Sequence, residues 1–291
     1  MRRWRIGALT AALATMAMTA AGPASARTIL FVGNSFTFGA NSPVMRYRPD
    51  LVRDLNREGI GGVPALFKTF AEQARQDWTV SLETAGGRDL AYHYEQKRRE
   101  IDGRWDVVIL QGYSTLDPQR PGDPIRHAEA AGAIAAMLRQ ANPRVRVELV
   151  STWTRADLTY RTPSPWRGRA VTAMADDLAA ANMYAVRRYP VISGAIPVGQ
   201  AWNRAWTDRI ADPNPYDGIA FGQLDLWTWD QYHASAAGYY LEALVIFEKV
   251  TGVDVRQLGE QERAGRDLGL EPRSMARLQA IAHAEVTSVR P

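Results

Sequence analysis

Five short strand-like runs, alternating with longer segments of helical spacing, constrain the fold of this chain more than any other feature. The run at 105–110 ends in Val-Val-Ile-Leu, and the run at 28–32 is apolar almost throughout. Such runs are typical of strands that are buried on both faces of a parallel sheet, and their alternation with helices places helices on both faces. We therefore predict one α/β domain with three layers (α/β/α) and a five-stranded parallel sheet, with strands at 28–32, 79–84, 105–110, 145–150 and 191–196.

The domain is expected to span residues 27–253. Between Thr37 and Gly62 the chain should be irregular, because Pro43 and Pro49 interrupt any long helix there. Residues 254–291 carry two polar helical segments, which we expect to form an appendage packed on the same domain. The predicted helices of the domain are 63–75, 90–101, 124–141, 169–189 and 235–250.

Residues 1–26 have the pattern of a secretory signal peptide. Three arginines precede an alanine-rich apolar stretch, and Ala24-Ser25-Ala26 is a small-x-small cleavage site. We expect cleavage after Ala26 and a periplasmic or secreted mature protein. No later apolar run has transmembrane length, so we expect no stable membrane insertion. The chain has no cysteine, which excludes disulfides and thiol chemistry.

The charge balance argues against a nucleic-acid-binding protein. The formal charge of the chain is +4. Without Arg2, Arg3 and Arg5 of the signal segment, 32 basic residues stand against 31 acidic ones, and the charge is +1. The chain has no basic block. It also lacks metal-ligand spacing, a dinucleotide-binding motif and a phosphate loop, so we expect neither a metal nor a cofactor. The sequence leaves the oligomeric state open.

Ser35 lies just after the first strand, in Gly33-Asn34-Ser35. Ligands bind at the carboxyl ends of parallel strands, so this serine could meet a substrate. As the alternative, Ser35 is simply a turn or cap residue. Near the other end of the chain, Asp230 and His233 stand three residues apart before a helical run, which can bring carboxylate and imidazole together. An isolated Asp-x-x-His would more often be a helix-capping pair. Together, however, the three residues supply a nucleophile, its base and the acceptor that orients the base.

These two motifs, taken together, resemble those of the SGNH (GDSL-like) hydrolase superfamily. The resemblance runs from about Thr28 to Val253, with Gly-Asn-Ser in place of the usual Gly-Asp-Ser. It implies a flavodoxin-like SGNH hydrolase fold and a Ser-Asp-His triad of Ser35, Asp230 and His233.

The resemblance also implies an oxyanion hole. The family pattern points to the backbone N–H groups of Ser35 and Gly87, although Gly87 could equally be a plain turn glycine. The family's Gly-x-Asn-Asp is missing after the third strand, where the chain reads Leu110-Gln-Gly-Tyr-Ser-Thr115. Gln111 or Ser114 could replace the asparagine, and we favour the Gln111 amide because its donor lies in a fixed plane.

Several tryptophans precede His233. Trp202 and Trp206 have helical spacing and should pack in the core, whereas Trp227 and Trp229 are candidates for contacting a sugar ring. We predict an exported serine esterase that hydrolyses short-chain esters, O-acetyl esters of a glycan among them. Two alternatives remain: a lipase or lysophospholipase of the same family, and a catalytically silent glycan-binding protein on the same fold.

Overall fold

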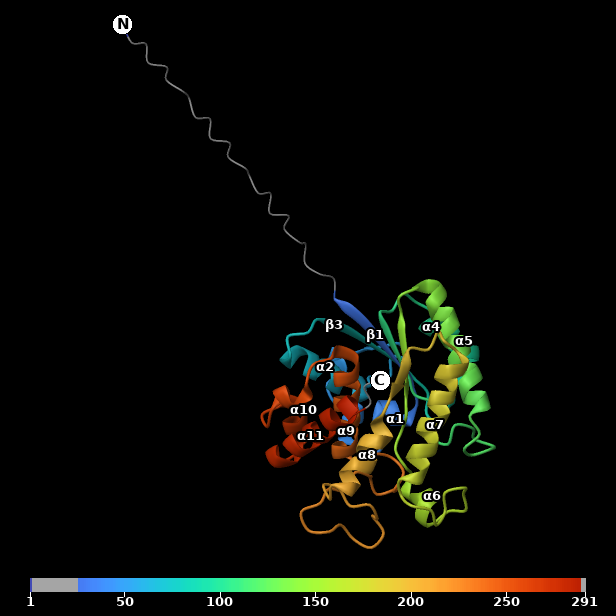
Figure 1. Ribbon diagram of the computed structural model, residues 1–291, viewed down its shortest axis with the longest axis vertical. Coiled ribbons are helices and arrows are strands. Elements are labelled where there is room, and N and C mark those ends of the chain that lie inside the picture. The colour runs from blue at the N-terminus through green and yellow to red at the C-terminus, as the bar shows by residue number, and fades with distance from the viewer. Residues whose placement is uncertain (2–25, 289–291) are drawn as a thin grey trace.

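The computed structural model describes residue 1 and residues 26–288 (Figure 1). The predicted signal peptide therefore falls, apart from its two end residues, outside the described residues.

Within residues 26–288, six parallel strands form one sheet, in the order β2-β3-β1-β4-β5-β6. The predicted parallel α/β fold is thus confirmed, but the prediction of five strands is wrong. The additional strand, β2, is only two residues long and pairs at the sheet edge, with Arg53 beside Ser81 and Asp54 beside Leu82. Two polar residues at an edge carry no apolar run, so the sequence pattern could not reveal them. The strands are β1 (Arg27–Gly33), β2 (Arg53–Asp54), β3 (Trp78–Thr84), β4 (Val107–Leu110), β5 (Arg146–Val150) and β6 (Gly194–Ile196).

The long helices begin and end within a few residues of their predicted bounds. One prediction needs correction, because the helix expected at 90–101 is two helices separated by Lys97, whose backbone is not helical. The α-helices are α1 (Ser35–Phe38), α2 (Gly62–Gln73), α3 (Leu90–Gln96), α4 (Arg98–Ile101), α5 (Ile125–Ala141), α6 (Ala156–Tyr160), α7 (Ala173–Arg188), α8 (Val198–Thr207), α9 (Ala236–Thr251), α10 (Arg263–Asp267) and α11 (Pro272–Ser288). The short 3-10 helices are η1 (Pro43–Arg46), η2 (Pro49–Leu51) and η3 (Val255–Leu258).

Two apolar cores cover the two faces of the sheet, because successive strand residues point to opposite faces. Ile29 and Phe31 of β1 belong to the core shared with α2, α8 and α9. Leu30 and Val32, between and after them, belong to the core shared with α3 and α5. Figure 1 shows the same three layers, with α2, α9 and α11 to one side of the sheet and α5 and α7 to the other.

The C-terminal helix α11 packs against α8 and α9. Its Glu285 forms an ion pair with Arg204 at 2.8 Å, and its Gln279 side chain donates to the Tyr240 hydroxyl at 3.1 Å. Among residues 26–288, no helix combines the length and the apolar character that crossing a bilayer requires.

The strand register brings the loops that carry the predicted site to one edge. Gly33 at the end of β1 pairs with Thr84 of β3, and Val32 pairs with Leu110 of β4. The loops after β1, β3 and β4 therefore start at nearly the same level, at the carboxyl edge where ligands bind in open parallel sheets.

Candidate active site

Ser35 is the first residue of the short helix α1 and is buried. Asn34 caps this helix, because its side-chain oxygen accepts from the Phe36 N–H at 3.2 Å. The Ser35 carbonyl accepts from the Tyr239 hydroxyl at 3.1 Å, which ties α1 to α9. The Ser35 hydroxyl itself makes no hydrogen bond to another residue that the structure describes. It is thus free to engage a substrate.

Asn34 fastens three loops together beside this serine. Its amide nitrogen donates to the Arg88 carbonyl at 2.9 Å and to the Gly112 carbonyl at 3.1 Å. These carbonyls belong to the loops that follow β3 and β4. An amide can donate two hydrogen bonds at once, whereas a carboxylate can donate none. The asparagine in Gly-Asn-Ser therefore has a specific structural task here.

Asp230 holds His233 through one carboxylate oxygen. His233 Nδ1 lies 2.6 Å from Asp230 Oδ2, and Oδ1 accepts from the Thr228 hydroxyl at 2.8 Å. Oδ1 also accepts from the main-chain N–H groups of Tyr232 and His233, at 3.0 and 2.9 Å. Burial alone would raise the pKa of this carboxyl, but the hydrogen bond from His233 and the three other donors outweigh it and lower the pKa to about 2. Asp230 is therefore ionised throughout the neutral range.

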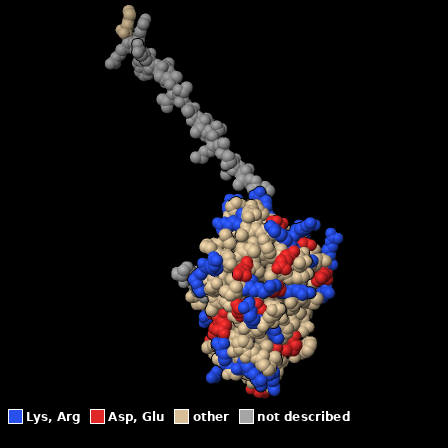
Figure 2. Space-filling model, turned by 90° about the vertical axis from the view of Figure 1, so that its right-hand side faces the viewer, with Lys and Arg blue, Asp and Glu red and all other residues tan. Residues whose placement is uncertain are grey.

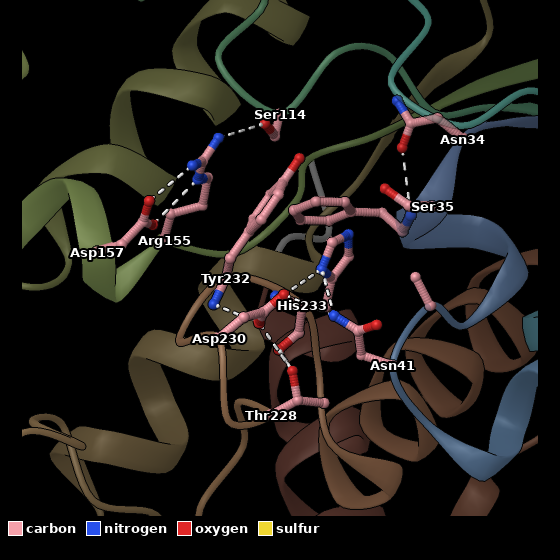
Figure 3. A network of polar contacts seen from close by, with 12 residues as sticks. Asn34, Ser35, Asn41, Ser114, Arg155, Asp157, Thr228, Asp230, Tyr232 and His233 are labelled. Atoms are coloured by element: carbon pink, nitrogen blue, oxygen red, sulfur yellow. Dashed lines mark hydrogen bonds and ion pairs between the residues drawn. The ribbon is translucent and has the colours of Figure 1, made fainter. Parts of the chain in front are cut away.

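Asn41 is a further member of this network that the sequence did not reveal. Its Nδ2 donates to Asp230 Oδ2 at 2.7 Å and lies 3.4 Å from His233 Nδ1 (Figure 3). Asn41 sits in the loop after α1 with a φ of 59°, a conformation that asparagine tolerates better than most residues. The loop that follows Ser35 thus contacts the Asp230–His233 pair directly.

The second nitrogen of His233 points to its chemical role. Because Nδ1 faces the carboxylate, it carries the proton, and Nε2 is left as an acceptor. Nε2 is buried and has no hydrogen-bond partner among the described residues. The Phe36 ring, next to Ser35 in the chain, packs on the imidazole with ring centroids 5.7 Å apart. Ser35 and Nε2 do not bond to each other here, and in unliganded sites such bonds often form only when substrate binds.

The oxyanion candidates differ in their surroundings. Gly87 is exposed in the loop after β3 and has a φ of 68°, which favours glycine. Apart from its two chain neighbours, no described residue has an atom within 4 Å of the place where a Cβ would stand, so this side of Gly87 is open. Together with the N–H of Ser35, which begins α1 and has no partner within the helix, it can face a developing negative charge.

Gln111 does not fit the oxyanion role, which corrects the favoured prediction. Its side-chain oxygen accepts from the Asn34 N–H at 2.9 Å and from the Thr37 hydroxyl at 3.0 Å. Its amide nitrogen donates to the Gly112 carbonyl, and the side chain is buried. Gln111 therefore positions the loop that carries Ser35. Ser114, the alternative, is also buried and accepts from Arg155 Nη1 at 3.3 Å, while Arg155 pairs with Asp157 at 2.7 Å.

The comparison with solved structures identifies the fold. A DUF4886 family protein from Bacteroides uniformis superposes with a TM-score of 0.64 and 19% identity, over 90% of this chain and 95% of that one. A candidate GDSL-like lipase from Parabacteroides merdae superposes with a TM-score of 0.54 and 17% identity, over 78% of this chain and 96% of that one. The chain has the SGNH hydrolase fold. No protein-family model matches the sequence, and sequence comparison finds no curated relative.

Within this SGNH fold, the two tryptophans proposed to bind substrate lie in different environments. Trp227 is buried, donates to the Thr154 carbonyl at 2.9 Å and stacks on Trp206 with ring centroids 5.1 Å apart. The prediction that Trp227 contacts substrate is therefore wrong, because no face of its ring is open. Trp202 and Trp206 are core residues, as predicted. Trp229 is 79% exposed and remains available.

The other three histidines of the chain have partners other than Asp230. His93 is fully buried and pairs with Glu83, while His127 Nε2 lies 2.7 Å from the Asn182 side-chain oxygen. His283 lies between Glu248 and Asp254, and one ligand atom from each of the three residues falls within a 4.8 Å cluster that could hold a metal ion. Other contacts already engage the two carboxylates of this cluster, since Glu248 accepts from the Val255 N–H and Asp254 pairs with Arg256. These contacts fit an ion-pair network that joins α9, η3 and α11.

Proposed function

We propose that this protein is an exported serine esterase that uses Ser35, Asp230 and His233 to cleave short-chain carboxylic esters. One observation carries the proposal: an ionised Asp230 fixes His233, whose buried Nε2 has no partner among the described residues and whose ring packs against Phe36 of the helix that Ser35 begins. Among the described residues, this arrangement leaves an imidazole acceptor and a serine hydroxyl without hydrogen-bond partners, and the Phe36 ring that follows Ser35 contacts the imidazole; nucleophilic catalysis by serine requires such a pair. The SGNH fold supports the same reading.

In the first half-reaction, His233 Nε2 takes the Ser35 proton while Ser35 Oγ attacks the ester carbonyl carbon. Asp230 stabilises the imidazolium that forms, because its charge stands 2.6 Å from Nδ1. The carbon–oxygen bond to the alcohol then breaks, and His233 returns the proton to the leaving oxygen. In the second half-reaction, water attacks the acyl-enzyme with the same imidazole as base, which releases the acid and restores Ser35.

The negative oxygen of the tetrahedral intermediate needs donors that are already in place. We assign this role to the backbone N–H groups of Ser35 and Gly87, since Gly87 faces open space and Ser35 begins α1. Ser114 remains a candidate for a third donor: it accepts from Arg155, whose guanidinium can only donate, so the Ser114 proton is free to point elsewhere.

The surface and the signal-like N-terminus support a neutral substrate outside the cytoplasm. Figure 2 shows basic and acidic side chains interspersed over one face of the molecule, so no single-sign field covers it. O-acetyl and other short-chain esters carried on a glycan fit these features, with Trp229 as an exposed ring that could contact a sugar.

Hydrolysis of para-nitrophenyl esters of increasing chain length tests the proposal. We expect the acetate to be cleaved faster than the palmitate, and Ser35→Ala to lower kcat by about 10⁴-fold or more. Ser42→Ala is the control: it changes a partly exposed serine in the loop that follows α1 and should leave kcat unchanged. Preference for the palmitate would instead support a lipase, and full activity of Ser35→Ala would exclude the mechanism.

A further inference from the structure

A cleft opens next to Gly87, on the side of the site that faces α3 and α5. It encloses about 430 Å³, within the size range of small-ligand sites. Its walls come from three segments: the loop after β3 together with α3, the loop after β4, and the start of α5. The lining residues that matter here are Gly87, Arg88, Tyr92, Gln96, Tyr113 and Arg126.

Asn34 connects this cleft to the nucleophile. Its side chain donates to the carbonyls of Arg88 and Gly112. Arg88 lines the cleft, and Gly112 directly precedes Tyr113, which also lines it. Ser35 follows Asn34 directly. A substrate whose carbonyl oxygen rests on the Gly87 N–H can therefore extend from Ser35 into the cleft.

The lining has the chemistry of a site for a neutral polyhydroxylated group. Tyr113 offers an aromatic ring, and Tyr92 offers the ring face that Arg88 leaves uncovered, since the Arg88 guanidinium lies 5.0 Å from the centroid of the Tyr92 ring. Both tyrosines are only partly buried. The cleft's two arginines, Arg88 and Arg126, are balanced by its two carboxylates, one of which, Asp89, accepts from Arg126 at 2.6 Å. A sugar presents C–H faces to rings and hydroxyls to such polar groups. A fatty chain would need an apolar wall, and a phosphate would need excess positive charge.

We propose that this cleft binds the sugar alcohol of the ester, so that the acyl group lies on Ser35 and the leaving oxygen carries a glycan unit. The inference rests on the proposed esterase function and adds the place and class of the alcohol. Apart from the Gly87 N–H, which serves every ester, the cleft would contribute to binding of glycan esters and nothing to the hydrolysis of small aryl esters, which lack a sugar.

Kinetics on two substrates separate these contributions. For Tyr113→Ala and Gln96→Ala, we expect KM for an acetylated xylo-oligosaccharide to rise about tenfold, a typical loss for truncating one important contact. KM and kcat for para-nitrophenyl acetate should stay within about twofold of the wild-type values. This substrate has no sugar, so it makes no contact that these substitutions could remove. Gln96 is exposed, so its truncation does not threaten the fold. Tyr184→Ala, which removes an exposed tyrosine lining a different hollow on α7, is the matched control and should change neither substrate.

A binding measurement keeps the cleft testable apart from catalysis. In a Ser35→Ala background, calorimetry with the same oligosaccharide should give a Kd about tenfold weaker when Tyr113→Ala is added. Unchanged KM and Kd in the cleft variants, or equal losses on both kinetic substrates, would overturn the proposal. Failure of the esterase function would show differently, as a wild-type protein that hydrolyses neither substrate, and the binding result would still decide the role of the cleft.

Discussion

Asn41 donates its side-chain N–H to Asp230 across 2.7 Å, joining two loops that lie 189 residues apart in the sequence. Asn41 belongs to the loop that follows Ser35 and α1, whereas Asp230 belongs to the loop that carries His233. The same carboxylate oxygen accepts from His233 Nδ1. The contact therefore sets the position of the imidazole relative to Ser35.

Replacing Asn41 should lower activity without abolishing it. In Asn41→Ala we expect kcat to fall about tenfold, equivalent to about 1.4 kcal/mol, because Asp230 loses one donor that fixes its orientation. Asn203→Ala removes a comparable bond on α8, from Asn203 Nδ2 to the Asp176 carboxylate at 3.0 Å, and should leave kcat unchanged. Steady-state kinetics on para-nitrophenyl acetate measure both variants. Equal kcat for wild type and Asn41→Ala would show that the contact does not position the triad.

The lowered pKa of Asp230 predicts a specific pH dependence of stability. A carboxyl group whose pKa is lowered on folding stabilises the folded state fully above its unfolded pKa of about 3.9. That contribution is lost as the pH falls through the folded value of about 2. Asp230→Asn removes the titrating group, so the difference in free energy of unfolding between wild type and variant should shrink between pH 5 and pH 2. Urea denaturation at several pH values measures this difference, and a constant gap would contradict the lowered pKa.

The Asn34 amide leads to a prediction about the Gly-Asn-Ser sequence itself. Asn34→Asp installs the residue usual in the resembling family, but a carboxylate cannot donate to the Arg88 and Gly112 carbonyls. We expect a loss of about 1–3 kcal/mol in the free energy of unfolding and a lower kcat. Asn142→Asp is a matched control, since Asn142 donates to the Trp105 carbonyl at 2.7 Å. The control should lose stability yet keep kcat. An Asn34→Asp enzyme as stable and active as wild type would show that the two Asn34 hydrogen bonds do not hold the loops after β3 and β4 in place.

Trp227 and Trp229 should respond oppositely to truncation. Trp227→Ala removes a buried ring and should cost about 3–5 kcal/mol in the free energy of unfolding. Trp229→Ala removes an exposed ring and should change stability by less than about 0.5 kcal/mol. Thermal denaturation followed by circular dichroism compares the two. A similar melting temperature for both variants would contradict the assignment of Trp227 to the core.

Much of the fold followed from the sequence because its strands and helices carry strong apolar patterns. The buried run Val107–Leu110 and the long helix α5 are examples. The edge strand β2 escaped because its two polar residues bury little, and pairing with β3 alone defines it. The break at Lys97 is likewise a matter of backbone conformation that residue spacing does not encode.

At the candidate site, the sequence could supply chemistry but not contacts. Asp230 and His233 were predictable because they stand only three positions apart in the chain. Asn41 was not, since its partner is distant in the chain. Gln111 was misassigned for the same reason: its amide has suitable chemistry, but bonds to Asn34 and Gly112 turn it into a support for the nucleophile's loop.

The central claim is that His233 activates Ser35, and labelling with a fluorophosphonate tests it most directly. We predict a single adduct by intact-mass analysis of the wild-type protein, mapped to Ser35 by peptide sequencing, and none in His233→Ala. His283→Ala, which breaks another histidine–carboxylate pair (2.8 Å to Glu248), should label like wild type. No adduct on a folded wild-type protein, or labelling that survives in His233→Ala at the wild-type rate, would contradict the account.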